Sequence, residues 1–332
     1  MIRGALIGCG YWGRNILRVL SEMDGFDLRV VCDAKKPMGR IPRDVEFKED
    51  YRAVLKDGKI DCVFIATPAS THYEIAREFL ESKRHVFVEK PLTTDITSAQ
   101  ELCSIAEKQK VQLMVGEVFR FNEGIKYIKR MIDNRELGEI RYIEARRVGL
   151  GPVRNDVSVL WDLASHDIYI CNLFVGKEPF SVNCRGVSHN GVSDDISCLN
   201  LIYPTPNVLA TIYVNWEHPV IERKVIVGGT EKAVLFDDIE ASEKVRIYNK
   251  GIEYQAKNGD FGAWQAAVRD GDIVIPKLKL TQPLEEELRH FIECVEGREK
   301  CLSDGYEGAK TVKVLEVAET SRKNKGLEIR MP

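Results

Sequence analysis

The feature that most constrains the fold is a glycine-rich turn between an apolar run and an amphipathic segment. The run Ile2–Ile7 leads into Gly8-Cys9-Gly10-Tyr11-Trp12-Gly13, and a helical pattern covers Tyr11–Ser21. In such a turn the first glycine permits a tight bend, the second lets the backbone approach a pyrophosphate, and the third lets helix and sheet pack closely. The positive end of the helix favours phosphate charge. This order predicts a parallel-sheet domain that binds a dinucleotide.

Asp33 strengthens this prediction because it follows the next apolar run, 20 residues beyond Gly13. A carboxylate at this place accepts hydrogen bonds from the adenosine ribose and repels a 2′-phosphate. We therefore expect NAD, with NADP as the lesser alternative, because Lys35 and Lys36 follow closely and can reach a phosphate if the loop turns back.

The first 120 residues alternate short apolar runs with longer amphipathic segments. Further strands are expected at Leu28–Cys32, Cys62–Ala66, His85–Val88 and Gln112–Val115. Helices are expected at Asp50–Lys56, His72–Ser82 and Asp95–Lys110. Strands that are apolar throughout are typical of a sheet covered by helices on both faces. The prediction is an α/β Rossmann domain, a doubly wound parallel sheet, over residues 1–120.

The pattern changes in residues 121–332, where an α+β domain is expected for substrate binding and oligomerisation. From Pro179 to Lys250, strand-like runs succeed one another with turn residues between them, which predicts a large, mostly antiparallel open sheet. Helices are expected near Phe121–Asn134, Trp161–Phe174, Leu284–Glu296 and Tyr306–Ser321.

Composition excludes several classes of protein. The 332 residues are 44% apolar and 30% charged, with a net charge of −3, which is typical of a folded globular chain without general affinity for nucleic acid or membranes. No apolar run reaches the length of a membrane span, and the first residues lack the apolar block of a signal peptide. The nine cysteines contain no Cys-x-x-Cys pair. We expect core thiols in a cytoplasmic protein, without disulfides or a metal site.

Two further motifs follow buried strands, and together with the glycine turn they identify a family. Ala66-Thr67-Pro68 with His72, and then Glu89-Lys90-Pro91, stand in the order and spacing of the Gfo/Idh/MocA oxidoreductases, which the whole chain resembles. The resemblance implies a cis peptide bond before Pro91 and a cofactor contacted by Gly8, Gly10, Tyr11, Trp12, Gly13, Asp33, Ala66, Thr67, Pro68, His72, Glu89 and Lys90. Glu117 stands where members of the family commonly have histidine.

The resemblance also implies catalytic roles for Lys90, Asp162 and His166. Asp162 and His166 are four residues apart, so a helix brings both to one side. Oxidation of a secondary alcohol needs a base for the hydroxyl proton, and imidazole titrates in the useful range. His166 is the expected base, Lys90 polarises the hydroxyl, and Asp162 orients the pair or holds a sugar hydroxyl. Lys90 and His166 can exchange these roles.

The stretch Trp161–Asp167 most resembles members that act on nucleotide sugars, so we expect oxidation at C3 of a UDP-N-acetylglucosamine-type sugar. Candidate substrate contacts are Arg120, Arg147, Trp161, Asp162, His166 and Arg223, with Arg146 and Arg154 as further cations for the diphosphate. For each arginine, an ion pair within the protein is an equal alternative.

Three other functions stay open from the sequence. They are a dehydrogenase of free sugars or inositol, an enzyme that cleaves glycosides with transient use of NAD, and a regulatory protein that binds NAD(P) without turnover. In this family subunits pack on the large sheet, so the resemblance also implies a homodimer or homotetramer.

Overall fold

The computed structural model describes residues 1–36, 41–154, 156–189, 191–204, 207–256, 264–279 and 281–332. The chain forms two compact units. Unit 1 contains residues 1–122 and 281–316, and unit 2 contains residues 123–280 and 317–332. The sequence predicts a single domain boundary at residue 120. In the structure, residues 281–316 also belong to the amino-terminal unit.

Unit 1 is built on a six-stranded parallel sheet, which confirms the predicted Rossmann fold. The strand order is β3-β2-β1-β4-β5-β6, so the direction of winding reverses between β1 and β4. The strands are β1 (Ile2–Ile7), β2 (Phe26–Cys32), β3 (Glu46–Lys48), β4 (Cys62–Ile65), β5 (His85–Glu89) and β6 (Leu113–Gly116). Strand β3 has only three residues and none of them is buried, so it lacks the apolar pattern that marks the others.

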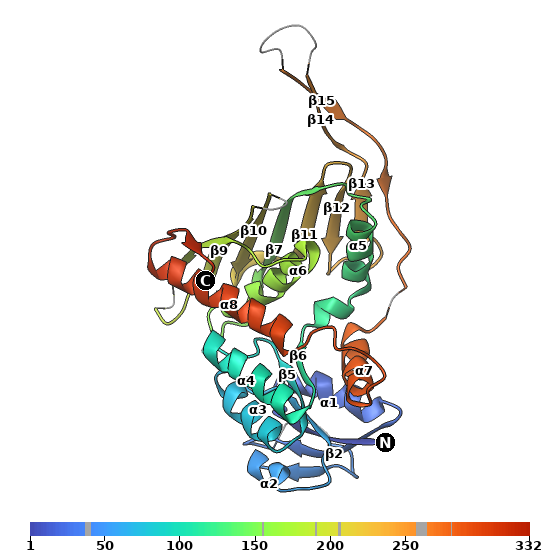
Figure 1. The fold of residues 1–332 in the computed structure, drawn as a ribbon, viewed down its shortest axis with the longest axis vertical. Helices are drawn as coiled ribbons and strands as arrows, with labels where there is room; N and C mark the ends of the chain where they lie inside the picture. Colours follow the sequence, from blue (N-terminus) through green and yellow to red (C-terminus); the bar gives the residue numbers. More distant parts are fainter. Residues whose placement is uncertain (37–40, 155, 190, 205–206, 257–263, 280) are drawn as a thin grey trace. The chain divides into compact units, whose positions relative to one another are not determined.

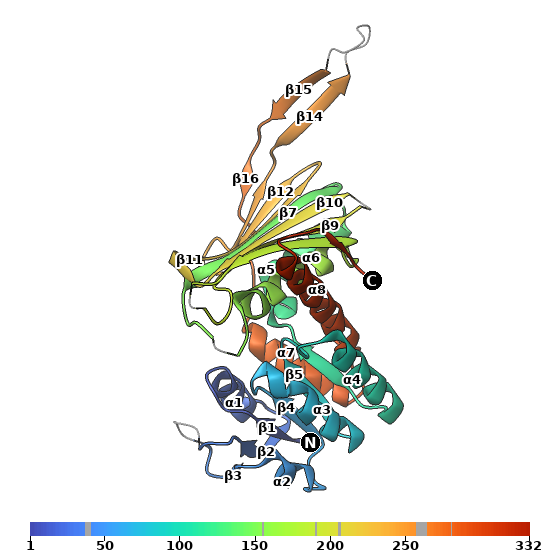
Figure 2. The same ribbon diagram turned by 90° about the vertical axis from the view of Figure 1, so that its left-hand side faces the viewer.

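Helices cover both faces of this sheet. Helices α3 and α4 lie on one face, and α1 lies on the other, where α7 packs against it (Figure 2). The helices of unit 1 are α1 (Gly13–Glu22), α2 (Tyr51–Leu55), α3 (His72–Glu81), α4 (Ile96–Gln109) and α7 (Pro283–Val295), with short 3-10 turns η1 (Ala69–Thr71) and η2 (Val118–Phe121). Asp95 caps α4 by accepting a hydrogen bond from the Ser98 amide at 2.8 Å.

Aromatic packing explains why the carboxyl-terminal segment belongs to unit 1. The Phe291 ring on α7 lies 5.2 Å from Phe64 on β4 and 5.8 Å from Phe87 on β5, and all three side chains are fully buried. Beyond α7, the Ser303 hydroxyl donates a hydrogen bond to the Val115 carbonyl at 2.9 Å, and the Val115 amide donates one to the Ser303 carbonyl at 2.8 Å. Helix α7 therefore completes the core beneath the sheet.

Unit 2 contains a nine-stranded sheet in the order β16-β13-β12-β11-β7-β10-β9-β8-β17 (Figure 1). Its pairs are antiparallel except β10 with β7, as the sequence predicts for a mostly antiparallel sheet. The strands are β7 (Ile140–Leu150), β8 (Ser181–Val187), β9 (Ile196–Tyr203), β10 (Val208–Asn215), β11 (Glu217–Gly229), β12 (Ala233–Asp237), β13 (Val245–Tyr248), β16 (Ile273–Val274) and β17 (Ile329–Arg330). A separate hairpin, β14 (Gly251–Ala256) with β15 (Trp264–Arg269), extends from this sheet.

The sheet of unit 2 has one face covered by helices α5 (Glu123–Asp133) and α6 (Ser165–Val175), which contact β12, β10 and β7 (Figure 2). Helix α8 (Gly305–Lys323) begins in unit 1 and ends in unit 2. The opposite face carries Tyr142 and Leu209, which pair in register and are both exposed. Among the helices that the structure describes, none combines the length and apolar composition needed to cross a bilayer.

Candidate active site

The glycine turn lies at the point where the winding of the unit 1 sheet reverses, between the ends of β1 and β4. Gly8 has φ +91°, and a Cβ there would lie 2.7 Å from the backbone of Ala66 and Thr67. A Cβ on Gly13 would clash with the Gly8 carbonyl, whereas one on Gly10 would meet nothing within 4 Å. Two of the three glycines therefore let segments of the protein approach each other, and the third leaves open space beside the exposed backbone.

The start of α1 fits an anionic ligand. Its N-cap residue, Trp12, makes no side-chain cap, and its first turn contains no acidic residue. The amides at a helix start need acceptors, and the helix dipole favours negative charge there. Tyr11 is 80% exposed beside this turn. These residues suit the pyrophosphate of a dinucleotide, and Gly10 gives it room.

Asp33 is held against the same turn. Its Oδ2 accepts a hydrogen bond from the Cys9 amide at 2.7 Å, and its Oδ1 accepts one from the Lys35 amide at 3.1 Å. The carboxylate is thereby fixed at the end of β2, where ribose hydroxyls are recognised in folds of this type. Lys35 and Lys36 are exposed.

Glu89 connects the second motif to the glycine turn. Trp12 donates a hydrogen bond from Nε1 to Glu89 Oε1 at 2.6 Å. Burial raises the pKa of Glu89 to about 7, against the opposing effects of the Trp12 hydrogen bond and the Lys90 charge. Glu89 thus fixes the Trp12 ring, and Lys90 follows at the end of β5, half-buried and joined to Pro91 by the cis peptide bond that the resemblance implies.

His72 joins the ends of two strands. Its Nδ1 lies 2.8 Å from the Pro91 carbonyl oxygen and its Nε2 lies 2.9 Å from the Thr67 carbonyl oxygen. The ring is buried, with 1% of its surface exposed. His72 therefore holds the Ala66–Pro68 and Lys90–Pro91 segments together, and this positioning role is not evident from the sequence motif alone.

Two more acidic side chains are buried in unit 1. Burial raises the pKa of both Glu117 and Glu287 well above the usual value, and the neighbouring carboxylates add to the effect at Glu287. Both oxygens of Glu287 and Oε2 of Glu117 lack a hydrogen-bond partner among the described residues. The Lys90 charge opposes the shift at Glu117. Glu287 is not predicted from the sequence because it lies in an ordinary amphipathic helix, 170 residues after Glu117 in the chain.

In unit 2, Asp162 and His166 lie on consecutive turns where a π-helical turn, η3 (Leu160–Ala164), runs into α6. The sequence predicts a regular helix here, whereas the structure has a wider first turn, a distortion that is frequent at functional sites. Asp162, His166 and Trp161 are half-buried. Arg154 donates a hydrogen bond from Nη1 to Asp162 Oδ1 at 3.3 Å and also pairs with Asp156.

The candidate arginines differ in their surroundings. Arg147 is buried and binds Asp167 through two hydrogen bonds, at 2.8 and 3.0 Å, so its guanidinium stabilises unit 2 internally. Arg223 lies opposite Arg147 in the β11–β7 register and is 53% exposed, with Asp238 4.0 Å away. Arg120, on η2 of unit 1, has a buried Nε without a partner among the described residues. Arg146 pairs with Glu222 at 3.0 Å.

Comparison with known proteins identifies the family of the chain. The family described as "Oxidoreductase family, NAD-binding Rossmann fold" matches residues 2–117, and the "GFO/IDH/MocA C-terminal domain" matches residues 125–234. The chain is 22% identical over 331 residues to the uncharacterized oxidoreductase YrbE of Bacillus subtilis, covering 95% of this chain and 93% of that protein.

Two other similar proteins have more specific names. The UDP-N-acetylglucosamine 3-dehydrogenase of Acidithiobacillus ferrooxidans is 33% identical over 131 residues, which cover 39% of this chain and 41% of that protein. The WlbA dehydrogenase from Bordetella pertussis, solved with NADH and UDP-GlcNAcA, shares the fold with a TM-score of 0.78 and 19% identity, covering 100% of this chain and 99% of that chain. The chain thus belongs to the Gfo/Idh/MocA family of oxidoreductases, and its amino-terminal domain is an NAD-binding Rossmann fold.

Proposed function

We propose that this protein is an NAD-dependent dehydrogenase of a nucleotide sugar, which oxidises the C3 hydroxyl of a UDP-N-acetylhexosamine or its uronic acid. The observation that carries the proposal is the arrangement at the start of α6. There Asp162 and His166 occupy consecutive turns, and Arg154 is hydrogen-bonded to Asp162. An acid, a base and a cation together suit a polyhydroxylated substrate with a charged group. The similarity to a UDP-N-acetylglucosamine 3-dehydrogenase supports the same substrate class.

Oxidation of a secondary alcohol breaks one O–H bond and one C–H bond. The bound NAD supplies the acceptor for the hydride. The protein must accept the hydroxyl proton, and Lys90 and His166 are the two groups proposed for it. A neutral lysine amine or a neutral imidazole can accept this proton. Either group then becomes a cation, which stabilises the negative charge that develops on the alkoxide. Asp162 hydrogen-bonds a sugar hydroxyl and fixes the orientation of the ring.

A diphosphate needs cations that solvent can reach and that the protein does not hold tightly. Arg223 meets this requirement best because its side chain is 53% exposed and its ion pair with Asp238 is long, at 4.0 Å. Arg154 is the second candidate, since its hydrogen bonds to Asp156 and Asp162 use three of the five N–H donors of a guanidinium and leave two for a phosphate oxygen. Arg147 is left out of the proposed substrate site because Asp167 occupies its guanidinium in the interior of unit 2.

A polyol dehydrogenase is the second candidate because other relatives are named as inositol dehydrogenases. That function would use Lys90, Asp162 and His166 in the same way and would leave Arg223 without a role. A regulatory protein without turnover is less well supported, since it has no chemical need for all three of these residues.

The deciding experiment follows NADH formation with NAD and four substrates: UDP-N-acetylglucosamine, its uronic acid, free N-acetylglucosamine and inositol. Each assay is run with and without 2-oxoglutarate, which can reoxidise a retained cofactor. We expect a signal with a UDP-sugar alone. Turnover of inositol or free sugar alone would replace the proposal with the second candidate. NAD binding without turnover of any of the four would contradict both, and released sugar without net NADH would indicate glycoside cleavage.

We also propose that the chain forms a homodimer or homotetramer through the face of the unit 2 sheet that bears Tyr142 and Leu209. Both side chains are close to half exposed on the face opposite α5 and α6, and apolar surface of this kind is usually covered by a partner. Light scattering tests the proposal, and a monodisperse monomer at micromolar concentration would contradict it.

A further inference from the structure

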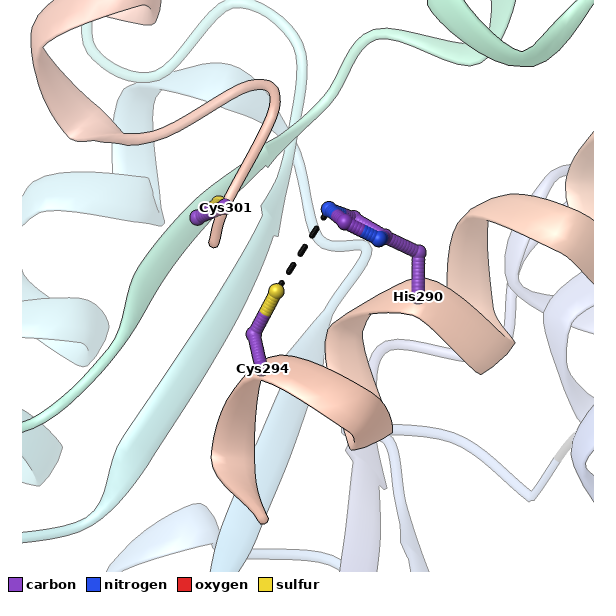
Figure 3. A group of neighbouring side chains, drawn as sticks. All are labelled: His290, Cys294 and Cys301. Carbon is purple, nitrogen blue, oxygen red and sulfur yellow. Dashed lines mark hydrogen bonds between the residues drawn. The ribbon is translucent and has the colours of Figure 1, made fainter. Parts of the chain in front are cut away.

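Unit 1 brings together an imidazole and two of the cysteines that the sequence predicts to be core thiols. His290, Cys294 and Cys301 place an imidazole nitrogen and two sulfur atoms within 4.8 Å of one another (Figure 3). None of them belongs to the glycine turn or to the motifs after β4 and β5. The expectation of no metal site rests on the lack of a Cys-x-x-Cys pair, and this cluster uses the spacing His-x3-Cys-x6-Cys instead.

Two elements bring the three residues together. His290 and Cys294 are four residues apart on α7, so they share one side of the helix. Gly297, with φ +73°, ends the helix, and its amide donates a hydrogen bond to the Cys294 carbonyl at 3.1 Å. The chain then turns back and presents Cys301 to the same side, as Figure 3 shows.

The returning segment is fixed immediately after Cys301. The Ser303 hydroxyl donates a hydrogen bond to the Val115 carbonyl at 2.9 Å, and the Val115 amide donates one to the Ser303 carbonyl at 2.8 Å. Cys301 is therefore held between a helix on one side and strand β6 on the other. Such support is what a preformed ligand set requires.

The nitrogen–sulfur separation suits a tetrahedral ion with nitrogen and sulfur ligands. Cys294 Sγ lies 3.4 Å from His290 Nε2. Zinc bonds of about 2.0–2.1 Å to nitrogen and about 2.3 Å to sulfur separate two such ligands by about 3.5 Å at the tetrahedral angle. The ring of His290 is oriented by Phe121, whose centroid is 5.3 Å away.

The tautomer of His290 also suits a metal. Its Nε2 accepts a hydrogen bond from the Leu302 amide at 3.1 Å, so this nitrogen carries a lone pair and no proton. The same nitrogen faces Cys294 Sγ. An ion at the centre of the three atoms would replace the Leu302 amide as the partner of that lone pair.

We propose that His290, Cys294 and Cys301 bind one Zn²⁺ ion, with water as the fourth ligand. Each thiol that becomes a ligand releases its proton to solvent, and no electron is transferred. His290 and Cys294 are buried, while the half-buried Cys301 provides the route of entry. The ion would connect the end of α7 to the segment before α8. This site is independent of the proposed dehydrogenase activity.

A second group of potential ligands must be distinguished from this one. His189, Asp195 and Glu217 of unit 2 also approach within 4.8 Å, and two of the three are exposed. That group contains no sulfur. Co²⁺ discriminates between the two, because only thiolate ligands give a sulfur-to-cobalt charge-transfer absorption.

The test uses the full chain, reduced and treated with a chelator that is then removed. It is titrated with Zn²⁺ against a chromophoric chelator, and separately with Co²⁺. We expect one Zn²⁺ per chain and a charge-transfer band for two thiolates. In Cys301→Ser the band should halve and the affinity should fall about 100-fold or more, since the loss of even an outer hydrogen bond costs 10- to 100-fold. Cys198→Ser, which changes a half-buried cysteine of β9, is the matched control.

A third substitution distinguishes loss of the metal site from loss of the folded core. His290→Gln keeps an acceptor for the Leu302 amide, and circular dichroism and NAD binding show whether it is folded. Folded His290→Gln should lose the tetrahedral cobalt spectrum while keeping NAD binding. The proposal is overturned if the wild type binds no stoichiometric Zn²⁺, if its cobalt spectrum lacks the thiolate band, or if Cys301→Ser and Cys198→Ser bind Zn²⁺ equally.

Discussion

The candidate sites of unit 1 and unit 2 are built from different parts of the polypeptide. In unit 1 the candidate site consists largely of backbone: the glycine turn, the start of α1 and the ends of β4 and β5, held by Asp33, Glu89 and His72. In unit 2 the candidate site consists of charged side chains, and Arg147 and Arg154 are paired with carboxylates of the same unit.

The difference has a physical reason. A dinucleotide presents the same pyrophosphate to every protein that binds it, so amides and a helix dipole recognise it without any particular side chain. Sugars differ in the placement of their hydroxyl groups, and only side chains can match them. We therefore expect substitutions in unit 1 to affect cofactor binding through backbone geometry, and substitutions in unit 2 to separate into structural and functional pairs.

The largest effect is expected for Lys90→Ala. If Lys90 takes or shares the hydroxyl proton, kcat should fall by about 10²- to 10⁴-fold, the usual contribution of a general acid or base. Steady-state kinetics would measure it, with whichever substrate the NADH assay identifies. Lys108→Ala, an exposed lysine of α4, is the matched control. Should Lys90→Ala keep wild-type kcat while His166→Ala loses it, the proton acceptor is His166.

Arg147→Ala should have the next largest effect, on stability. It leaves Asp167 buried and uncompensated, which costs about 3–5 kcal/mol in the free energy of unfolding. Urea denaturation would measure the change. Arg223→Ala should alter stability by less than about 0.5 kcal/mol and raise KM for a UDP-sugar about tenfold. A stable Arg147→Ala protein with a raised KM would return Arg147 to the substrate site.

Gly8→Ala and Gly10→Ala separate the two uses of glycine in the turn. Gly8→Ala forces a Cβ against the backbone of Ala66 at positive φ and should destabilise the protein by about 1–3 kcal/mol. Gly10→Ala meets no protein atom, so it should keep wild-type stability and weaken NAD binding about tenfold. Thermal unfolding and NAD titration would show both effects. Unchanged NAD affinity in Gly10→Ala would mean that the pyrophosphate does not approach this residue.

Glu287→Gln should change stability in a way that depends on pH. Burial raises the pKa of native Glu287 above its ordinary value of 4.5, so the native state holds a proton that the unfolded state releases. Wild-type stability therefore falls as pH rises from about 4.5 toward the native pKa, by up to about 1.4 kcal/mol per pH unit for one group. Glu287→Gln should match the wild type near pH 5 and exceed its stability by about 1 kcal/mol or more at pH 8. The exposed Glu299→Gln should show no such difference, and parallel pH profiles for all three proteins would contradict the explanation.

Prediction from sequence succeeds where a residue pattern and a local structure coincide. Local residue patterns specify the glycine turn, strand β1 and the helices of unit 1. Their positions are therefore predicted to within a few residues. The two-residue strands β16 and β17 are too short to show an alternating pattern, and they exist only because a neighbouring strand offers free hydrogen bonds.

The parts of the site that were not predicted depend on contacts between distant segments. The pairing of Arg147 with Asp167 requires β7 and α6 to be placed against each other, and nothing in either segment specifies it. The same holds for the burial of Glu287 near Glu89 and Glu117. The cluster of His290, Cys294 and Cys301 differs, because its residues are close in the chain. The spacing His-x3-Cys is a usable signal there, since two ligand types at helical spacing share one side of a helix.

The position of α7 has a consequence for the order in which the protein is made. The core under the first sheet lacks Phe291 until more than four fifths of the chain has left the ribosome. Until then, Phe64 on β4 and Phe87 on β5 lack the ring that packs against them in the folded protein. A nascent chain that stalls before residue 281 exposes this apolar surface to chaperones and proteases. Unit 1 is therefore completed only after strands β7 to β16 of unit 2 have been synthesised.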